Sequence, residues 1–522
     1  MRAVRRSAVF LMTAALIGAA CSSNGGSGGG NSPGATGKPR YGGDVTIARV
    51  ADSESMDKTN VFDNESIWIF EQIYEMLYTV TPDGKDVRPW LATSYDLSSD
   101  QLTWTFHLRP GVKFSNGQPM TASDVKFSID EASKAKDGWG YINSAIKTIT
   151  TPDPETVVIK TKYPWSPLLA DLSLFNNGII PDNYAGKTSK EFYDAPIGTG
   201  PFMWDHWTKG QELKLVKNPN YWQKGKPYLD SVTWTTVGDD NTRILQLKGG
   251  QAQVDEFPPW SSVSDLQHTA GVTMNLFPST RTDYLLFNER VKPFQDVHVR
   301  RAISLAIDRS AMVKAVTFGY GKPAYSFIAP NVPYHDTNAG GLQYNLDQAK
   351  QEMAQSSVPN GFTTTLLLGA GTVDENSEAQ IIQQELQPLG IKITLNKVDP
   401  SDEFTKIQDF DYSLGFSYWT MDIADPDELV TFAVDPTSGA HSFFTDYKNQ
   451  DVIDWTHAAE REFDTSKRAQ FYNQIQEQAS KDAFMAYLYW SPYRYATTSK
   501  LHGFFVTPLG NYHMEDAWLS SS

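Results

Sequence analysis

The single cysteine of the chain, Cys21, limits what this sequence can fold into. One cysteine cannot form a disulfide within the chain, so any folded domain must be stabilised by a hydrophobic core. The chain has 522 residues. The roughly 480 residues that follow the first forty are enough for a large core shared among two or three domains.

Cys21 ends an apolar segment that is typical of a secretory signal. Three arginines within the first six residues precede an apolar run over residues 8–20, which is shorter than the about 20 residues that span a bilayer. Residues 16–21 (LIGAAC) resemble a bacterial lipobox, although Gly18 stands where leucine is usual. We expect residues 1–21 to be a lipoprotein signal peptide, with Cys21 lipidated. An ordinary cleaved signal is the alternative.

A segment rich in Gly and Ser follows over residues 22–40. It contains too little apolar surface to fold, so we expect a flexible linker between a lipid anchor and the body of the protein. No second apolar run is long enough to span a membrane. We therefore expect an exported protein, anchored by lipid to the outer face of the cytoplasmic membrane.

Charge and motifs exclude several functional classes. The net charge is −16 and no basic cluster is present, which argues against nucleic acid as a partner. The nine histidines are scattered, and the sequence has no metalloprotease motif, nucleophile elbow, phosphate-binding loop or dinucleotide fingerprint. We expect a monomer with no cofactor, no bound metal and no enzymatic activity, although a secreted hydrolase with paired carboxylates is not excluded by the sequence.

The periodicity of apolar residues indicates mixed α and β structure throughout. Alternating residues predict strands over 44–50, 102–108, 156–160, 212–217 and 391–398. Helical spacing predicts helices over 65–78, 297–317 and 378–389, and one that starts after Thr121 with Asp124 closing a capping box. Gly390 is expected to end the helix before it.

Several sequence blocks, in a fixed order and spacing, resemble the family 5 extracellular solute-binding proteins, the peptide- and nickel-binding components of bacterial ABC importers. The resemblance covers nearly all of the chain after the linker. The blocks are YGG at 41–43, PWLA at 89–92, LTWTFHLRPGVKFSNG at 102–117, GTGPF at 198–202, NPNYW at 218–222, residues 288–294, and VRRAI to AIDR at 299–309.

The resemblance implies an α/β, two-lobed periplasmic-binding-protein-like fold of the large three-subdomain type, with the ligand in a cleft between the lobes. Lobe I is expected to comprise residues 41–292 and 489–522, with an inserted subdomain at about 86–205. Lobe II is expected at residues 293–488. The two lobes would close on a peptide or other small solute and present it to the membrane permease of an ABC importer.

The segment 417–428 (SYWTMDIADPDE) contains four acidic residues. Asp425 suits an N-cap, Glu428 stands where a capping box needs it, and Asp427 complements the helix dipole. Asp422 is left without such a role. The resemblance implies that Asp422, in a Trp-x-x-Asp pattern, pairs with the free α-amino group of a peptide, because a buried ammonium needs an anionic partner.

Further ligand-binding candidates surround Asp422 in the expected cleft. Trp419, Tyr418 and Thr420 precede it in the same loop. Core packing is an equally good explanation for the two aromatic candidates of the inserted subdomain, and the two candidates of the early loop are weaker. These four residues are Trp139, Tyr141, Asn64 and Glu65.

The resemblance implies an arginine that holds the carboxylate in dipeptide binders, and residues 368–372, which occupy its region, contain none. The strand expected at 411–416 also lacks the arginine found in some oligopeptide binders. This absence argues against a strict dipeptide receptor and favours longer peptides. A receptor for an oligosaccharide or another small solute is the alternative, and a nickel or metal-chelate receptor is disfavoured because no histidines cluster near the loop.

Overall fold

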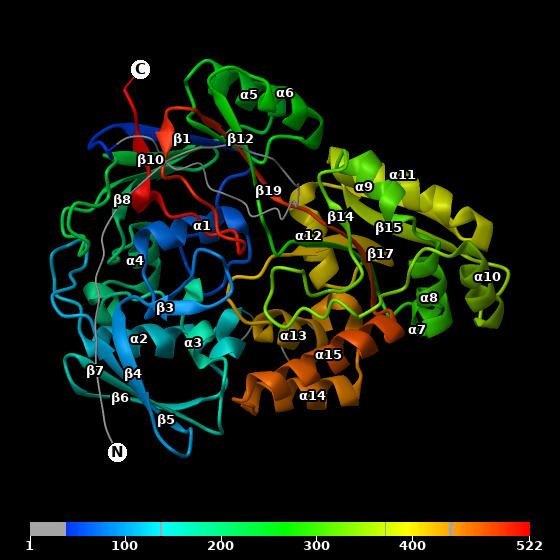
Figure 1. Cartoon of the computed structure of the whole chain (residues 1–522), viewed down its shortest axis with the longest axis horizontal. Coiled ribbons are helices and arrows are strands. Elements are labelled where there is room, and N and C mark those ends of the chain that lie inside the picture. Colours follow the sequence, from blue (N-terminus) through cyan, green and yellow to red (C-terminus); the bar gives the residue numbers. More distant parts are fainter. Residues whose placement is uncertain (1–37, 136–137, 371, 438–441, 522) are drawn as a thin grey trace, which may run out of the picture. The chain divides into compact units, whose positions relative to one another are not determined.

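A seven-stranded sheet lies at the top left of the computed structural model (Figure 1), which describes residues 38–135, 138–370, 372–437 and 442–521. Its strand order is β12-β19-β11-β1-β10-β9-β8. The strands are β1 (Asp44–Arg49), β8 (Phe202–Thr208), β9 (Glu212–Lys217), β10 (Ser231–Thr236), β11 (Val254–Glu256), β12 (Val272–Phe277) and β19 (Tyr493–Thr498). Strand β1 is parallel to both of its neighbours, and the other pairs are antiparallel. Helices α1 (Asn64–Ile73), α5 (Asp240–Lys248) and α6 (Val263–Gln267) contact these strands.

A six-stranded sheet of order β14-β18-β13-β17-β15-β16 lies on the other side of the cavity described below. Its strands are β13 (Thr282–Phe287), β14 (Lys322–Pro323), β15 (Thr363–Gly369), β16 (Lys392–Val398), β17 (Leu414–Trp419) and β18 (Met485–Trp490). The helices of this part of the chain are α7 (Lys292–Gln295), α8 (Val297–Ala306), α9 (Arg309–Val316), α10 (Leu346–Gln355), α11 (Val373–Glu385), α12 (Pro400–Gln408), α13 (Asp427–Val434), α14 (Gln450–Arg461) and α15 (Thr465–Asp482). Helices α8, α9 and α11 share one buried apolar cluster with this sheet.

A four-stranded antiparallel sheet of order β4-β5-β7-β6 has its own hydrophobic core. Its strands are β4 (Ala92–Leu97), β5 (Thr103–Leu108), β6 (Ile146–Asp153) and β7 (Thr156–Thr161). The side chains of β5 alternate, with Trp104, Phe106 and Leu108 buried against α2 (Ala122–Ala132). Short elements complete this region, namely β2 (Tyr78–Val80), β3 (Val87–Pro89), α3 (Leu168–Asp171) and α4 (Ser189–Asp194).

Strands β18 and β19 join the two large sheets directly. β18 lies between β14 and β13, and β19 lies between β12 and β11. Only residues 491 and 492 separate the two strands. The last hairpin, β20 (Leu501–His502) with β21 (Trp518–Leu519), follows β19. The chain therefore passes from the interior of one sheet to the interior of the other within two residues.

Most expected elements are present, and three helices differ in extent. The helix expected over 378–389 begins earlier, at Val373, and ends at Glu385, with a short 3-10 turn over Gln387–Leu389 before Gly390. The expected helix over 297–317 is two helices, α8 and α9, because Asp308 caps a new helix by accepting the N–H of Ala311 at 3.0 Å. The expected helix over 65–78 ends at Ile73, and β2 begins at Tyr78.

The capping predictions at α2 and at Gly390 are confirmed. The backbone N–H of Thr121 donates to the Asp124 carboxylate at 2.7 Å at the start of α2. Gly390 has a φ of 74° and ends the turn that follows α11.

Candidate functional site

The loop after β17 carries Asp422 into the interior of the protein. The N–H of Met421 donates to the hydroxyl of Thr280 at 2.9 Å. The N–H groups of Asp422 and Ile423 then donate to one carboxylate oxygen of Glu428, at 2.9 and 3.0 Å. These bonds fix the loop, and the Asp422 residue is only 6% exposed.

Asp422 belongs to a cluster of three buried carboxyl groups. Burial raises the pKa of Asp422 to about 8, although a hydrogen bond with the Glu428 side chain works against this rise. Burial and the neighbouring charge of Asp422 raise the pKa values of both Glu428 and Glu71 well above their usual range. In the described part of the chain no Lys, Arg or His forms an ion pair with these three groups. No cation of the described residues therefore offsets the rise of these pKa values.

Buried polar atoms without partners surround the same cluster. Among the described residues, Glu71 Oε2, Glu428 Oε1 and the indole N–H of Trp419 have no hydrogen-bond partner. Such atoms are rare in folded proteins because leaving them unpaired costs free energy. A bound polar group could satisfy them.

The remaining acids of the segment differ in part from their predicted roles. Helix α13 begins at Asp427, and Asp425 accepts the N–H of Asp427 at 3.0 Å. The Asp425 carboxylate also forms a two-bond ion pair with Arg468, at 2.5 and 2.8 Å. The predicted capping-box role of Glu428 is wrong, because its carboxylate holds the loop at Asp422 instead.

The predicted aromatic residues meet beside this loop. Trp419 packs on Phe432, with ring centres 4.4 Å apart, and on Trp139 at 6.1 Å. Trp139 is 2% exposed and donates its indole N–H to a backbone carbonyl, so it is a core residue. Tyr141 stacks on Trp139 and donates its hydroxyl to the carbonyl of Glu428 at 3.2 Å. Both therefore pack beside the segment that carries Asp422.

The structure places the early-loop candidates in the first turn of α1. The backbone carbonyl of Glu65 accepts hydrogen bonds from Arg49 and Ser53. Burial and the charge of Asp63 raise the pKa of the Glu65 carboxyl to about 7. Asn64 is half-buried at the helix start. Neither Asn64 nor Glu65 lines the cavity described next.

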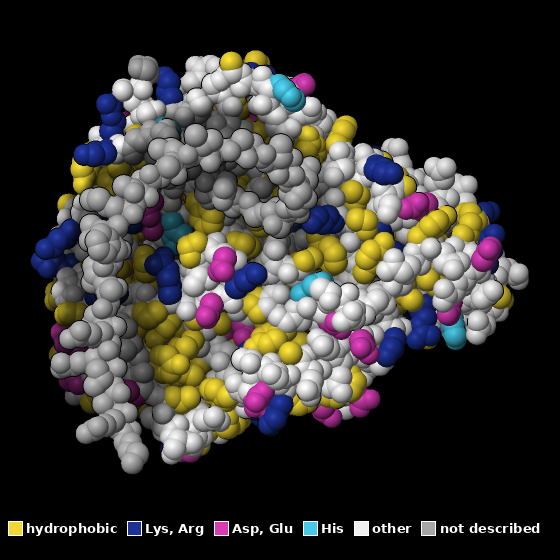
Figure 2. Space-filling model, in the orientation of Figure 1, with side chains coloured by type: hydrophobic (Ala, Val, Ile, Leu, Met, Phe, Trp, Pro, Cys, Tyr) yellow, Lys and Arg dark blue, Asp and Glu magenta, His cyan; other side chains and the backbone are white. Residues whose placement is uncertain are grey.

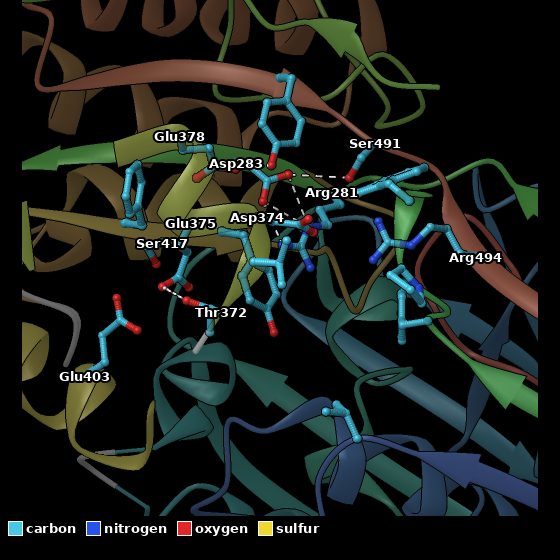
Figure 3. A pocket seen from close by; sticks show the side chains of 18 of the residues that line it. Arg281, Asp283, Thr372, Asp374, Glu375, Glu378, Glu403, Ser417, Ser491 and Arg494 are labelled. Carbon is cyan, nitrogen blue, oxygen red and sulfur yellow. Dashed lines mark hydrogen bonds and ion pairs between the residues drawn. The ribbon is translucent and has the colours of Figure 1, made fainter. Parts of the chain in front are cut away.

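A cavity of about 700 Å³ lies between residues that belong to the two large sheets and their helices (Figure 3). Of the eight predicted ligand-binding residues, all of which lie in the described part of the chain, Tyr418 lines this cavity and the other seven do not. The charged groups that line it are Asp240, Arg243, Arg281, Asp283, Asp374, Glu375, Glu378, Glu403 and Arg494. The cavity can therefore recognise a solute by charge as well as by shape.

None of the three arginines of the cavity was predicted from the sequence, and two of them lie over aromatic rings. Arg281 donates to Asp283 at 2.7 Å and lies over the ring of Tyr418 at 3.8 Å. Arg494 lies over the ring of Trp260 at 3.7 Å. Both stand outside the segments in which an arginine was sought. Their convergence depends on the crossing from β18 to β19, which leaves no local pattern in the sequence.

The other end of the cavity is acidic (Figure 3). Glu375 accepts the N–H of Gly369 at 2.8 Å and the hydroxyl of Thr372 at 2.9 Å. Burial and the adjacent Glu375 raise the pKa of Glu403 to about 8. These carboxyls occupy the region where an arginine was expected for a dipeptide receptor.

Three general features bear on the class of protein. Among the described residues, no group of His, Cys, Asp and Glu is arranged to hold a metal ion. In the same residues no helix is both long and apolar enough to cross a membrane. On the face drawn in Figure 2, the Lys and Arg side chains of the described residues are scattered among Asp and Glu.

Residues 86–440 match the family model described as bacterial extracellular solute-binding proteins, family 5 (middle). The chain belongs to this family. The glutathione-binding protein GsiB of Escherichia coli K12 is 28% identical to this chain over 484 residues, which covers 91% of this chain and 94% of GsiB.

Solved structures agree with the family 5 assignment. The periplasmic binding protein DppA of Helicobacter pylori, in complex with the peptide STSA, has a TM-score of 0.85 and 28% identity, with coverage of 92% of this chain and 99% of DppA. AgaA of A. tumefaciens R10, in complex with agropinic acid, has a TM-score of 0.82 and 26% identity, with coverage of 92% and 99%.

The family fixes the fold and the general function. The predicted two-lobed α/β fold is confirmed by the likeness to these binding proteins. The protein is a family 5 extracellular solute-binding protein, and it is not an enzyme.

Proposed function

We propose that this protein is an exported lipoprotein, anchored through Cys21, that captures oligopeptides and delivers them to its permease. The peptide's α-ammonium binds Asp422, and the two lobes close on the peptide. Contacts with both lobes favour the closed state, so binding shifts the population toward it. Cys21 lies outside the described residues.

The unbalanced carboxyl cluster is the observation that supports this proposal. A buried carboxylate is stable when a cation neutralises it, and the described residues supply none to Asp422, Glu428 or Glu71. An ammonium group carries three N–H donors and one positive charge. It can satisfy the free oxygens of Glu71 and Glu428 while it pairs with Asp422.

The names of the relatives support a peptide as the solute. GsiB is a glutathione-binding protein, and the DppA structure holds the peptide STSA. The acidic groups at Thr372–Glu375, where a dipeptide receptor would need an arginine, support a peptide whose carboxylate lies further along the cleft.

Replacement of Asp422 by Asn tests the amine anchor. Asparagine keeps the shape of the side chain but cannot neutralise an ammonium, so the Kd for unblocked tri- to pentapeptides should rise by about tenfold or more. Isothermal titration calorimetry measures the Kd, and native mass spectrometry identifies which peptides bind.

The exposed Asp454, replaced by Asn, is the matched control, and its Kd should equal that of the wild type. N-acetylated peptides should bind the wild type as weakly as unblocked peptides bind the Asp422 variant. A wild-type Kd in the folded Asp422→Asn protein would disprove the anchor. A sugar or metal chelate as the co-purifying ligand would replace the peptide altogether.

A further inference from the structure

The guanidinium of Arg494 faces the cavity without an anionic partner. Arg494 forms no ion pair within the described part of the chain, and its Nε is buried without a hydrogen-bond acceptor. In Figure 3 its guanidinium points into the pocket, toward Asp374. Asp374 acts on Arg494 through its charge, but no ion pair joins the two side chains.

The other two arginines of the cavity already have partners. Arg281 is held by Asp283 at 2.7 Å. Arg243 is held by Asp240 and by Asp255, the latter at 3.1 Å. Among the described residues that line this cavity, Arg494 is thus the arginine that can bind an additional anion without losing an existing ion pair.

A rigid aromatic platform holds Arg494 in place. Trp260 lies 3.7 Å below the guanidinium and is 3% exposed. Tyr320 stacks on Trp260 with ring centres 6.1 Å apart and an interplanar angle of 13°. The stacking leaves the edge of the guanidinium free, and this edge is the part that binds a carboxylate through two parallel hydrogen bonds.

The environment makes an additional anion favourable. Burial lowers the pKa of Arg494 to about 10, and the like charge of Arg281 adds to this fall, although the charge of Asp374 works against it. A cation in such a place gains more from a bound anion than an exposed arginine does, because little water screens the pair.

We propose that Arg494, stacked on Trp260, is a subsite that binds a carboxylate of the solute. This inference rests on the proposed peptide function and adds a requirement to it, namely that the solute carries an acidic group as well as an amine. The carboxylate is supplied either by the peptide C-terminus or by an acidic side chain.

Three sets of unblocked tri- to pentapeptides test this subsite. The first set has free C-terminal acids and no charged side chains, the second has the same sequences as C-terminal amides, and the third has amides with one Asp or Glu. The wild type should bind the first set about tenfold or more tightly than the second, as charge-assisted hydrogen bonds would give. If a side chain supplies the carboxylate, the third set shows the preference instead.

Replacement of Arg494 by Gln should remove this preference and leave the Kd of the uncharged amides unchanged. Arg494→Lys should retain part of the preference, because lysine keeps the charge but lacks the planar pair of donors. The matched control is Arg88→Gln, since the exposed Arg88 also lies over a tryptophan, Trp90 at 4.7 Å, outside the cavity. Thermal unfolding confirms that each variant is folded.

The outcomes separate this subsite from the amine anchor. Equal binding of the three sets by the wild type, or an unchanged preference in Arg494→Gln, would overturn the subsite and leave the peptide function standing. A preference that depends on Arg494 together with an unaffected Asp422→Asn variant would support the subsite and refute the amine anchor. Failure of all three sets to bind the wild type would refute both.

Discussion

Individual buried charges determine what this cleft can bind. Asp422 could be singled out from the sequence because its neighbours suggested local roles and a family pattern covered it. Arg494 could not, because its partner Trp260 is distant in the sequence and the two meet only through the pairing of β19 with β11 and β12. The burial that raises the pKa of Asp422 is likewise a property of the folded protein.

The raised pKa of Asp422 predicts a pH-dependent stability of the empty protein. Burial raises its pKa from the ordinary value of 3.8 to about 8 in the folded state. Between these values the folded protein binds more protons than the unfolded chain, so the free energy of unfolding falls as pH rises. Asp422→Asn should make this slope shallower, by up to about 1.4 kcal/mol per pH unit within that window.

Urea unfolding from pH 5 to pH 8 measures the slope. Other buried carboxyls, such as Glu256 with a pKa raised to about 8, contribute to it in the same direction. The exposed control Asp454→Asn should keep the wild-type slope. A slope in Asp422→Asn as steep as that of the wild type would contradict the prediction.

At the scale of elements, the sequence predicted the type of each regular segment better than its limits. Alternation identified β5 and β9, because one face of each strand is buried. It did not reveal the break between α8 and α9, because apolar residues continue through Ile307 while Asp308 starts a new helix. The capping-box prediction for Glu428 was also wrong. Its carboxylate accepts an N–H group of the loop before α13 rather than one at the start of its own helix.

The start of α13 is held to α15 by the buried pair of Asp425 and Arg468. Asp425→Asn leaves a guanidinium that is 5% exposed without its carboxylate. The free energy of unfolding should fall by about 3 kcal/mol. Denaturant unfolding, monitored by far-ultraviolet circular dichroism, measures the change.

A double variant, Asp425→Asn with Arg468→Met, provides the control for this pair. Removal of both charges should cost less than the sum of the two single changes, because no unpaired charge remains. Additive losses would show that the two side chains contribute independently.

At the scale of the whole molecule, the family blocks predicted the fold because they cover most of the chain. The limits of the lobes at residues 292 and 488 stay a prediction, as does the extent of the inserted subdomain. The cavity between the two sheets could be expected from the two-lobed fold, but its mixture of acidic and basic groups could not. That mixture depends on side chains from five separate elements, α5, β13, α11, α12 and β19, and from the loop before β13.

The proposed lipid anchor is tested on the full-length chain. Cys21→Ala should prevent lipidation and release the protein from the membrane fraction, because no other anchor is expected. Palmitate labelling and cell fractionation measure both effects, and Ser22→Ala is the control. Membrane retention of the Cys21→Ala protein would point to an uncleaved signal instead.

The direct connection of β18 to β19 also determines when, during synthesis, the two large sheets can fold. Each of these strands fills an interior position in its sheet, so both large sheets have a gap until residues 485–498 have left the ribosome. Domains that are complete earlier fold during synthesis, but here neither sheet is complete until almost the whole chain exists. We expect a nascent chain of this kind to complete its large sheets only late in synthesis, which suits the proposed export of the chain through a secretion channel.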